Sequence, residues 1–209
     1  MGTKTGGIVS EDALRYLREK VPMTAEEFKQ LEEKARSRAF TVGGITRLDL
    51  LQDMLNELRA AIEQGQTMQE FQKSIKERMT DKGWQGLTPY RIDTIFRTNV
   101  QTAYQVGRYQ QMRSPAVVDT RPYWMYDAVN DGATRPTHRA MDGMVWRYDD
   151  PIWDTWYPPN GFNCRCKVIA LSPAAAERRG VQIQTGDLPK SWDKETGEIL
   201  QMEPDQGFQ

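Results

Sequence analysis

The sequence predicts an α+β protein in which a helical N-terminal arm leads into a small, loop-rich antiparallel β domain. Up to about residue 113, apolar residues recur at intervals of three and four between helix start and stop signals. Beyond that point the composition changes, since five of the six tryptophans, nine of the eleven prolines, both cysteines and the single histidine follow it. We therefore expect a helical arm over 1–113, a β domain over 114–171 and a polar C-terminal tail over 172–209.

Four to five helices account for the arm. Ser10 has the side-chain oxygen of an N-cap and starts a short helix that runs through Lys20, before Pro22 ends it. Thr24-Ala25-Glu26-Glu27 is a capping box, in which the hydroxyl and the carboxylate satisfy free amides of the first turn. The apolar pattern that follows this box predicts a second helix, which continues to about Phe40.

The later helices of the arm have clear boundaries. The leucine-rich stretch 46–65 predicts a helix that ends at its final glycine. Thr67-Met68-Gln69-Glu70 is a second capping box, and its helix runs toward Gly83. The longest helix is expected over 88–112, where a threonine cap precedes a proline in the first turn, a position at which the missing N–H costs little.

The second half shows strand patterns instead. Tyr123–Tyr126 is aromatic and typical of a strand, and Met144–Trp146 also indicates extended chain. Cys164–Leu171 alternates as a final strand. These three short strands predict a small antiparallel sheet.

The connections between the strands are long and irregular. Turn residues fill 127–137, a short helix or turn fits 137–141, and 149–162 is an aromatic, proline-rich loop. The polar tail has one strand or turn at 183–188 and is expected to be mobile or bound to a partner. The aromatic rings of the loop either pack as core on the sheet, which we favour, or form an exposed platform for a partner. These rings belong to Trp153, Trp156 and Tyr157.

Charge and hydropathy exclude several classes of protein. The chain carries 28 Lys and Arg against 29 Asp and Glu, which argues against a DNA-coating polyelectrolyte. The arm has 18 basic and 15 acidic residues, and the remainder has 10 and 14. No stretch reaches the roughly 18 apolar residues of a membrane span, and the N-terminus lacks the hydrophobic region of a signal peptide. We expect a soluble protein without a membrane span.

His138, Cys164 and Cys166 are the soft metal ligands of the chain apart from methionine, and all lie within 29 residues. On a strand the two thiols would point to one face and chelate one ion, whereas a disulfide across Cys-x-Cys is strained. A tetrahedral zinc site needs a fourth ligand, and the candidates are Asp127, Asp131 and Asp142. Asp142 would lie one helical turn after His138. The alternative is that the cysteines are small buried apolar residues and the histidine is structural.

Two further functions stay open on the residues alone. A compact nuclease would use His138 as acid or base, with Arg135 and Arg139 to hold phosphate. The sequence shows no second histidine, nucleophile elbow or phosphate-cradling glycine loop, which favours a protein without catalytic residues. The other alternative is a zinc-stabilised nucleic-acid-binding module.

A series of motifs in the second half carries a family resemblance. Its elements are an aspartate, Arg-x-x-His, a glycine turn, Pro-Pro and Cys-Arg-Cys, in that order. In this sequence the stretches that carry these elements are Asp131-Gly132-Ala133-Thr134-Arg135-Pro136-Thr137-His138, Met141-Asp142-Gly143, Pro158-Pro159-Asn160-Gly161 and Asn163-Cys164-Arg165-Cys166. Two aromatic motifs belong to the same series, Trp124-x-Tyr126 and Asp149-Asp150-Pro151-Ile152-Trp153. The series resembles the head morphogenesis domain of the phage Mu F-like family, the minor capsid proteins of tailed bacteriophages. The arm is similar as well, so the resemblance covers about residues 10 to 170.

The resemblance implies a structural role in the virion and no enzyme. Family members are packaged inside the procapsid near the portal and take part in head assembly or DNA delivery. The implied partners are the portal protein, other head or scaffold proteins and phage DNA, and the implied location is the virion, with the host cytoplasm during assembly. The implied structural cluster is His138, Cys164 and Cys166, with Asp131 and Arg135 beside them. Ligand chemistry adds one structural zinc, held by the cluster and Asp142.

Overall fold

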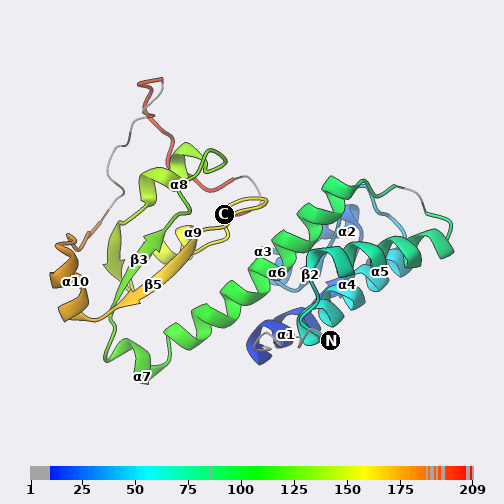
Figure 1. The fold of residues 1–209 in the computed structure, drawn as a ribbon, viewed down its shortest axis with the longest axis horizontal. Helices are drawn as coiled ribbons and strands as arrows, with labels where there is room; N and C mark the ends of the chain where they lie inside the picture. Colours follow the sequence, from blue (N-terminus) through cyan, green and yellow to red (C-terminus); the bar gives the residue numbers. More distant parts are fainter. Residues whose placement is uncertain are drawn as a thin grey trace, which may run out of the picture. The chain divides into compact units, whose positions relative to one another are not determined.

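The computed structural model describes residues 10–84, 86–186, 188, 191, 193, 196–205 and 208 (Figure 1). Helices precede a small antiparallel sheet, so the predicted α+β class is confirmed. The chain divides into two compact units, Met1–Gly107 and Arg108–Gln209. The finer division into arm, β domain and tail stays a prediction, and Trp192 lies outside the described residues.

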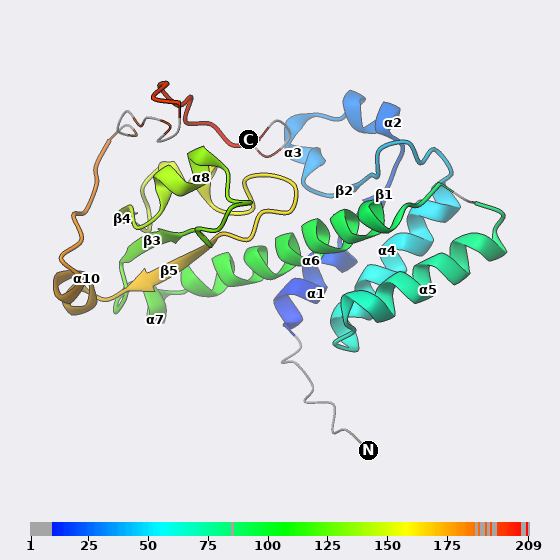
Figure 2. The ribbon, with the colours of Figure 1, turned by 45° about the horizontal axis from the view of Figure 1, so that its top comes forward.

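The first unit is built around one leucine-rich helix. This helix, α4 (Leu48–Glu63), lies between α1 (Glu11–Arg18) and α5 (Met68–Asp81), as Figure 2 shows. Its buried side chains form the centre of the core, because leucines at intervals of three and four share one face. The longest helix, α6 (Pro89–Met112), begins and ends where the sequence predicts. The predicted cap of α1 is confirmed, since the Ser10 side chain accepts a hydrogen bond from the Ala13 N–H.

The expected helix from residue 24 to about 40 is wrong. The predicted capping box does start α2 (Ala25–Gln30), but the chain is extended at its end, and a separate turn of helix follows as α3 (Glu33–Arg36). No residue of α2 is buried, so this stretch has no apolar face that would stabilise a longer helix. Two short parallel strands flank it, β1 (Val21–Pro22) and β2 (Ala39–Phe40). The described arm therefore has six helices rather than four to five.

The sheet of the second unit has the strand order β4-β3-β5, and both pairings are antiparallel. Its strands are β3 (Tyr123–Asp127), β4 (Val145–Arg147) and β5 (Lys167–Leu171). The first two confirm the predicted strands. The third is shorter than predicted, because the strand begins only at Lys167 and leaves Cys164 and Cys166 in the loop before it.

Alternation along the strands sends side chains to two different cores. Trp124 and Tyr126 face an aromatic core that also contains Trp153 and Trp156, which are 2% and 1% exposed. The interpretation of these two tryptophans as core residues is therefore confirmed. Met125 faces a second, smaller core on the other side of the sheet, which also contains Val145 and Leu171. Both faces of the sheet are thus covered.

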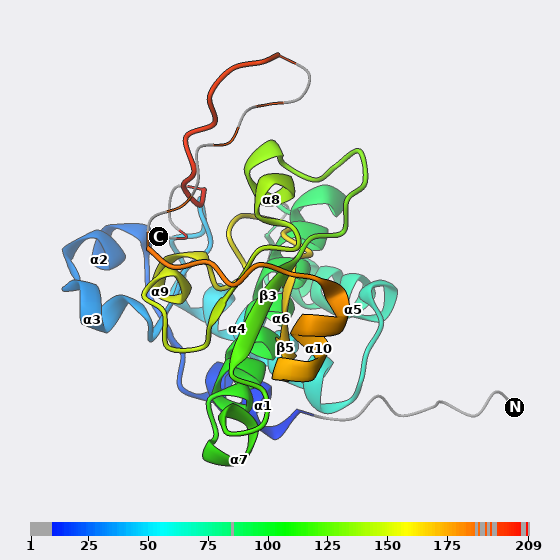
Figure 3. The ribbon, with the colours of Figure 1, turned by 90° about the vertical axis from the view of Figure 1, so that its left-hand side faces the viewer.

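Four short helices surround the sheet, and they are α7 (Pro115–Val118), α8 (Pro136–Met141), α9 (Ile152–Trp156) and α10 (Pro173–Arg179). The predicted short helix near 137–141 is confirmed as α8. The others were not predicted, although Ser172 caps α10 and Gly180 ends it in the left-handed conformation. Figure 3 shows α9 and α10 on opposite sides of β3.

Part of the predicted tail packs on the sheet of the second unit, and whether the tail is mobile or binds a partner stays a prediction. Helix α10 packs on β5, and Ile183 forms a parallel bridge with Val145. The Asp205 N–H donates to the carbonyl of Asn160 at 2.9 Å. The tail packs on the sheet because it supplies apolar residues such as Val181 and Ile183 to the smaller core. Among the described helices, none combines the length and the apolarity that crossing a membrane requires.

Candidate metal centre

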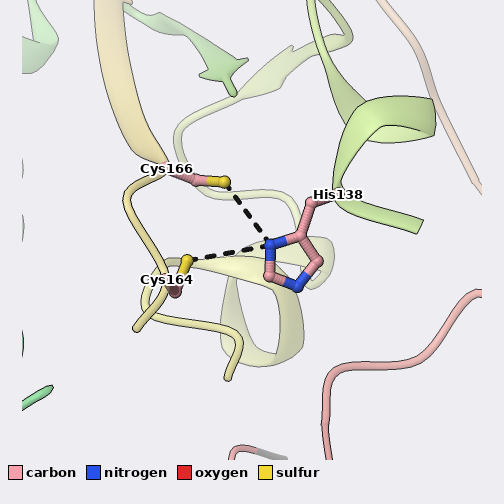
Figure 4. Close-up of side chains that lie close together, drawn as sticks. All are labelled: His138, Cys164 and Cys166. Carbon is pink, nitrogen blue, oxygen red and sulfur yellow. Dashed lines mark hydrogen bonds between the residues drawn. The ribbon is translucent and has the colours of Figure 1, made fainter. Parts of the chain in front are cut away.

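The single histidine and the two cysteines meet inside the second unit. The Nδ1 atom of His138 lies 3.8 Å from the Sγ atom of Cys164 and 3.5 Å from that of Cys166 (Figure 4). All three ligand atoms lie within 4.8 Å of one another. The three side chains are 2%, 5% and 3% exposed, and neither cysteine forms a disulfide. The structure therefore brings together the three residues that the sequence singles out.

Two separate elements supply these ligands. His138 projects from α8, a helix that Pro136 starts by occupying its first position. Cys164 and Cys166 lie in the loop before β5, so the prediction that they share a strand face is wrong. Both thiols nevertheless lie against the histidine ring. The Cys-x-Cys spacing in the loop directly before the strand therefore still brings the two sulfur atoms to the same ring.

The arrangement fits zinc. A sulfur and a nitrogen bound to one zinc at a tetrahedral angle, with bonds of about 2.3 Å and about 2.0 Å, are about 3.5 Å apart. The two sulfur–nitrogen separations, 3.5 and 3.8 Å, lie close to that value. A cavity of about 20 Å³ adjoins all three residues. Soft thiolates and an imidazole are the ligands that zinc prefers, so the donor set also fits.

The two thiols are electrostatically coupled. A hydrogen bond from Cys166, followed by one from His138, lowers the pKa of Cys164 against the opposing effect of burial. The same contact and burial raise the pKa of Cys166. A bound cation would supply the positive charge that favours ionisation of both thiols.

Tyr126 and Asn160 support the cluster from the sheet side. The Tyr126 hydroxyl donates to the Asn160 side-chain oxygen at 2.8 Å, and both residues are fully buried. Burial, more than the nearby thiols, raises the pKa of Tyr126, so its hydroxyl stays protonated. Trp156 presents an edge-on contact to the His138 ring, with centroids 6.3 Å apart. The sequence analysis quotes Tyr126 and Asn160 within motifs but assigns them no role.

An ion pair joins the two ligand-bearing segments. Arg165, between the cysteines, donates to both carboxylate oxygens of Asp131, each at 2.6 Å. This contact and the Ala133 N–H hold the pKa of Asp131 well below its usual range. Asp131 starts the turn that leads into α8, and Arg139 of that helix donates back to the Asp131 carbonyl at 3.1 Å. The pair therefore links the segment that carries the histidine to the one that carries the cysteines.

A second ion pair closes the same region from the tail. Arg135 contacts the Asp205 carboxylate at 2.8 Å and donates to the Phe162 carbonyl at 2.9 Å. Gly161 lies so close to Asp205 that a Cβ atom would collide with the carboxylate. A larger residue at this position would therefore push the Asp205 carboxylate away from its contact with Arg135.

The predicted fourth ligands lie elsewhere. Asp142 follows the end of α8 in a non-helical conformation, so the expected one-turn spacing from His138 does not form. Its carboxylate accepts hydrogen bonds from the Ala128 N–H at 2.8 Å and the Asn130 side chain at 2.6 Å. Asp127 pairs with Lys167 at 3.1 Å. Within the described part of the chain, the metal-ligand group contains no carboxylate.

A family model described as "Phage Mu protein F like protein" matches residues 52–169. The chain belongs to this family. The match begins in α4 and ends in β5, so it includes the three candidate ligands of the Mu F-like chain.

Two relatives extend the similarity over most of the chain. "Putative capsid assembly protein F" of Escherichia phage Mu is 39% identical over 214 residues, which cover 91% of this chain and 48% of the relative. "Mu-like prophage FluMu F protein" of Haemophilus influenzae is 39% identical over 205 residues, which cover 86% and 49%. The chain spans about half the length of these two relatives. No solved structure gives a significant match to it.

The buried Tyr126–Asn160 contact in this Mu F-like chain is testable by substitution. We expect Tyr126→Phe to lower the free energy of unfolding by about 1–3 kcal/mol, because it leaves the Asn160 oxygen buried without its donor. Tyr123→Phe, on the same strand and only partly buried, is the matched control and should change stability by less than about 0.5 kcal/mol. Urea unfolding followed by circular dichroism measures both. Equal stability of the two variants would contradict the assigned role of the contact.

Proposed function

We propose that the chain acts in head morphogenesis of a tailed bacteriophage or prophage, as a minor capsid protein inside the procapsid near the portal. The observation that carries this proposal is the 39% identity, over 91% of the chain, to a phage Mu protein named as a putative capsid assembly protein. The proposed partners are the portal protein and other head or scaffold proteins. Its place is the virion, with the host cytoplasm as the site of assembly.

The balanced charge of the chain argues against a role in coating DNA. With 28 basic against 29 acidic residues, it lacks the excess positive charge of a protein that coats DNA. A local contact with phage DNA during delivery remains compatible with this balance. The role is therefore one of assembly contacts rather than genome condensation.

A single structural zinc belongs to the proposal, held by His138, Cys164 and Cys166. The chain between β3 and β5 is long and contains only short elements, so ordering it costs considerable conformational entropy. A metal that joins His138, within this stretch, to the cysteines near its end would offset that cost, because binding energy at a site that exists only in the folded state stabilises the fold. The convergence of three buried soft ligands supports this interpretation.

The contacts of the arginines support a structural role over the nuclease alternative. Arg135 is held by Asp205 and Phe162, and Arg139 donates to the carbonyls of Asp131 and Thr134. The cavity at His138, of about 20 Å³, is far smaller than a nucleotide requires. The arrangement therefore favours a binding or packing role for these residues, and not phosphate chemistry.

The Asp131–Arg165 pair gives a test of the zinc proposal. Partners that orient metal ligands typically change metal affinity by 10–100-fold when they are removed, so we expect Asp131→Asn to weaken zinc binding by about tenfold. Asp149→Asn is the matched control, because Asp149 also pairs with an arginine, Arg147 at 2.8 Å, but outside the ligand segments. Competition with a chromophoric zinc chelator measures both affinities. Identical affinities for the two variants would remove the positioning role from Asp131.

The head-assembly proposal is tested in the phage or prophage that encodes the chain. Deletion of the gene should remove most DNA-filled heads from lysates seen by electron microscopy, and the wild-type gene supplied in trans should restore them. Mass spectrometry of purified heads should detect the protein at low copy number. Normal yields of filled heads without the gene, or purified heads that lack the protein, would overturn the proposal.

A further inference from the structure

We infer that the metal centre has only three protein ligands, and that its fourth coordination position is an exchangeable site for water or a small monodentate anion. The inference rests on the proposed structural zinc and adds a ligand-binding property to it. Structural zinc sites are ordinarily closed by four protein ligands, whereas an open position is typical of sites that bind or exchange a ligand. The distinction therefore changes what the centre can do.

The first observation is the geometry of the three ligand atoms. The two sulfur atoms lie 3.5 and 3.8 Å from His138 Nδ1, close to the separation of two ligands on one zinc, and all three ligand atoms lie within 4.8 Å of one another. The three residues come from α8 and from one short loop, and all of them border the same cavity. This cavity is the space beside the three ligand atoms that a fourth ligand would enter.

The second observation is that nearby carboxylates are engaged elsewhere. Both oxygens of Asp131 face Arg165, and both oxygens of Asp142 accept hydrogen bonds from Ala128 and Asn130. Asp205 pairs with Arg135. Among the residues that the structure describes, no further histidine, cysteine or acidic side chain joins the group.

The third observation is the size and lining of the cavity. A water molecule needs about 10–15 Å³ of such space, so a volume of about 20 Å³ admits one small ligand and no extended substrate. Besides the ligands, the lining includes Thr134, Arg135 and Arg165. Two thiolates already balance the charge of a divalent zinc, and Arg135 and Arg165 are paired with Asp205 and Asp131, so the surroundings favour a neutral or singly charged fourth ligand. Water and fluoride, an anion of similar size, meet these limits.

Cobalt(II) substitution tests the inference, because zinc itself has no d–d spectrum. The chain of residues 1–209 is loaded with one equivalent of cobalt(II), and its paramagnetic resonance spectrum is recorded in ordinary and in oxygen-17-enriched water. We expect line broadening in the enriched water, which reports a coordinated solvent oxygen. Fluoride should then shift the visible d–d bands in a saturable manner, with one fluoride per cobalt and with the thiolate-to-cobalt band retained.

The outcomes separate this inference from the proposal on which it rests. Failure of the wild-type protein to bind cobalt with a thiolate-to-cobalt band would overturn both the zinc proposal and the inference. Cobalt binding with that band, but without broadening in enriched water, would overturn the open position alone and indicate a fourth protein ligand. Cys166→Ser should reduce the thiolate-to-cobalt band, and an unchanged band in this variant would place the metal elsewhere and overturn both.

Discussion

The convergence of one imidazole and two thiols on a common point is the constraint on which the second unit depends. His138 and Cys164 are 26 residues apart, and the chain between them contains only short helices, one short strand and turns. Burying three polar ligands without a partner would be unfavourable, so their presence in an aromatic core needs a compensating interaction. The proposed zinc ion would supply it, and the Asp131–Arg165 pair links the two segments that carry the ligands.

The same constraint explains how a small domain with few regular elements stays ordered. Its sheet has three strands, and both faces are covered, one by the tryptophan-rich core and the other by α10 and the following residues. The tail closes over the loop beside the cluster through Asp205, which contacts Arg135 and the Asn160 carbonyl. A domain held in this way presents a fixed surface, which suits a protein proposed to make assembly contacts within a phage head.

The sequence predicts those helices whose boundaries are set by interactions between residues close together in the chain. Capping boxes, the leucine pattern of α4 and the proline that starts α6 have their causes within a few residues, so sequence alone located these helices. The three ligands were found because histidine and cysteine are rare in this chain. The fourth ligand could not be found in this way. The direction of the Asp142 side chain depends on where α8 ends. Its carboxylate accepts a hydrogen bond from the Ala128 N–H, a residue 14 positions earlier that only the fold brings into contact.

We propose that one zinc ion joins His138 to the two cysteines. Native mass spectrometry of the protein, purified without chelators, measures this directly. We expect a folded chain whose mass exceeds that of the polypeptide by one zinc, and whose metal is lost in His138→Ala. A folded, metal-free wild-type protein that also fails to take up added zinc would contradict it.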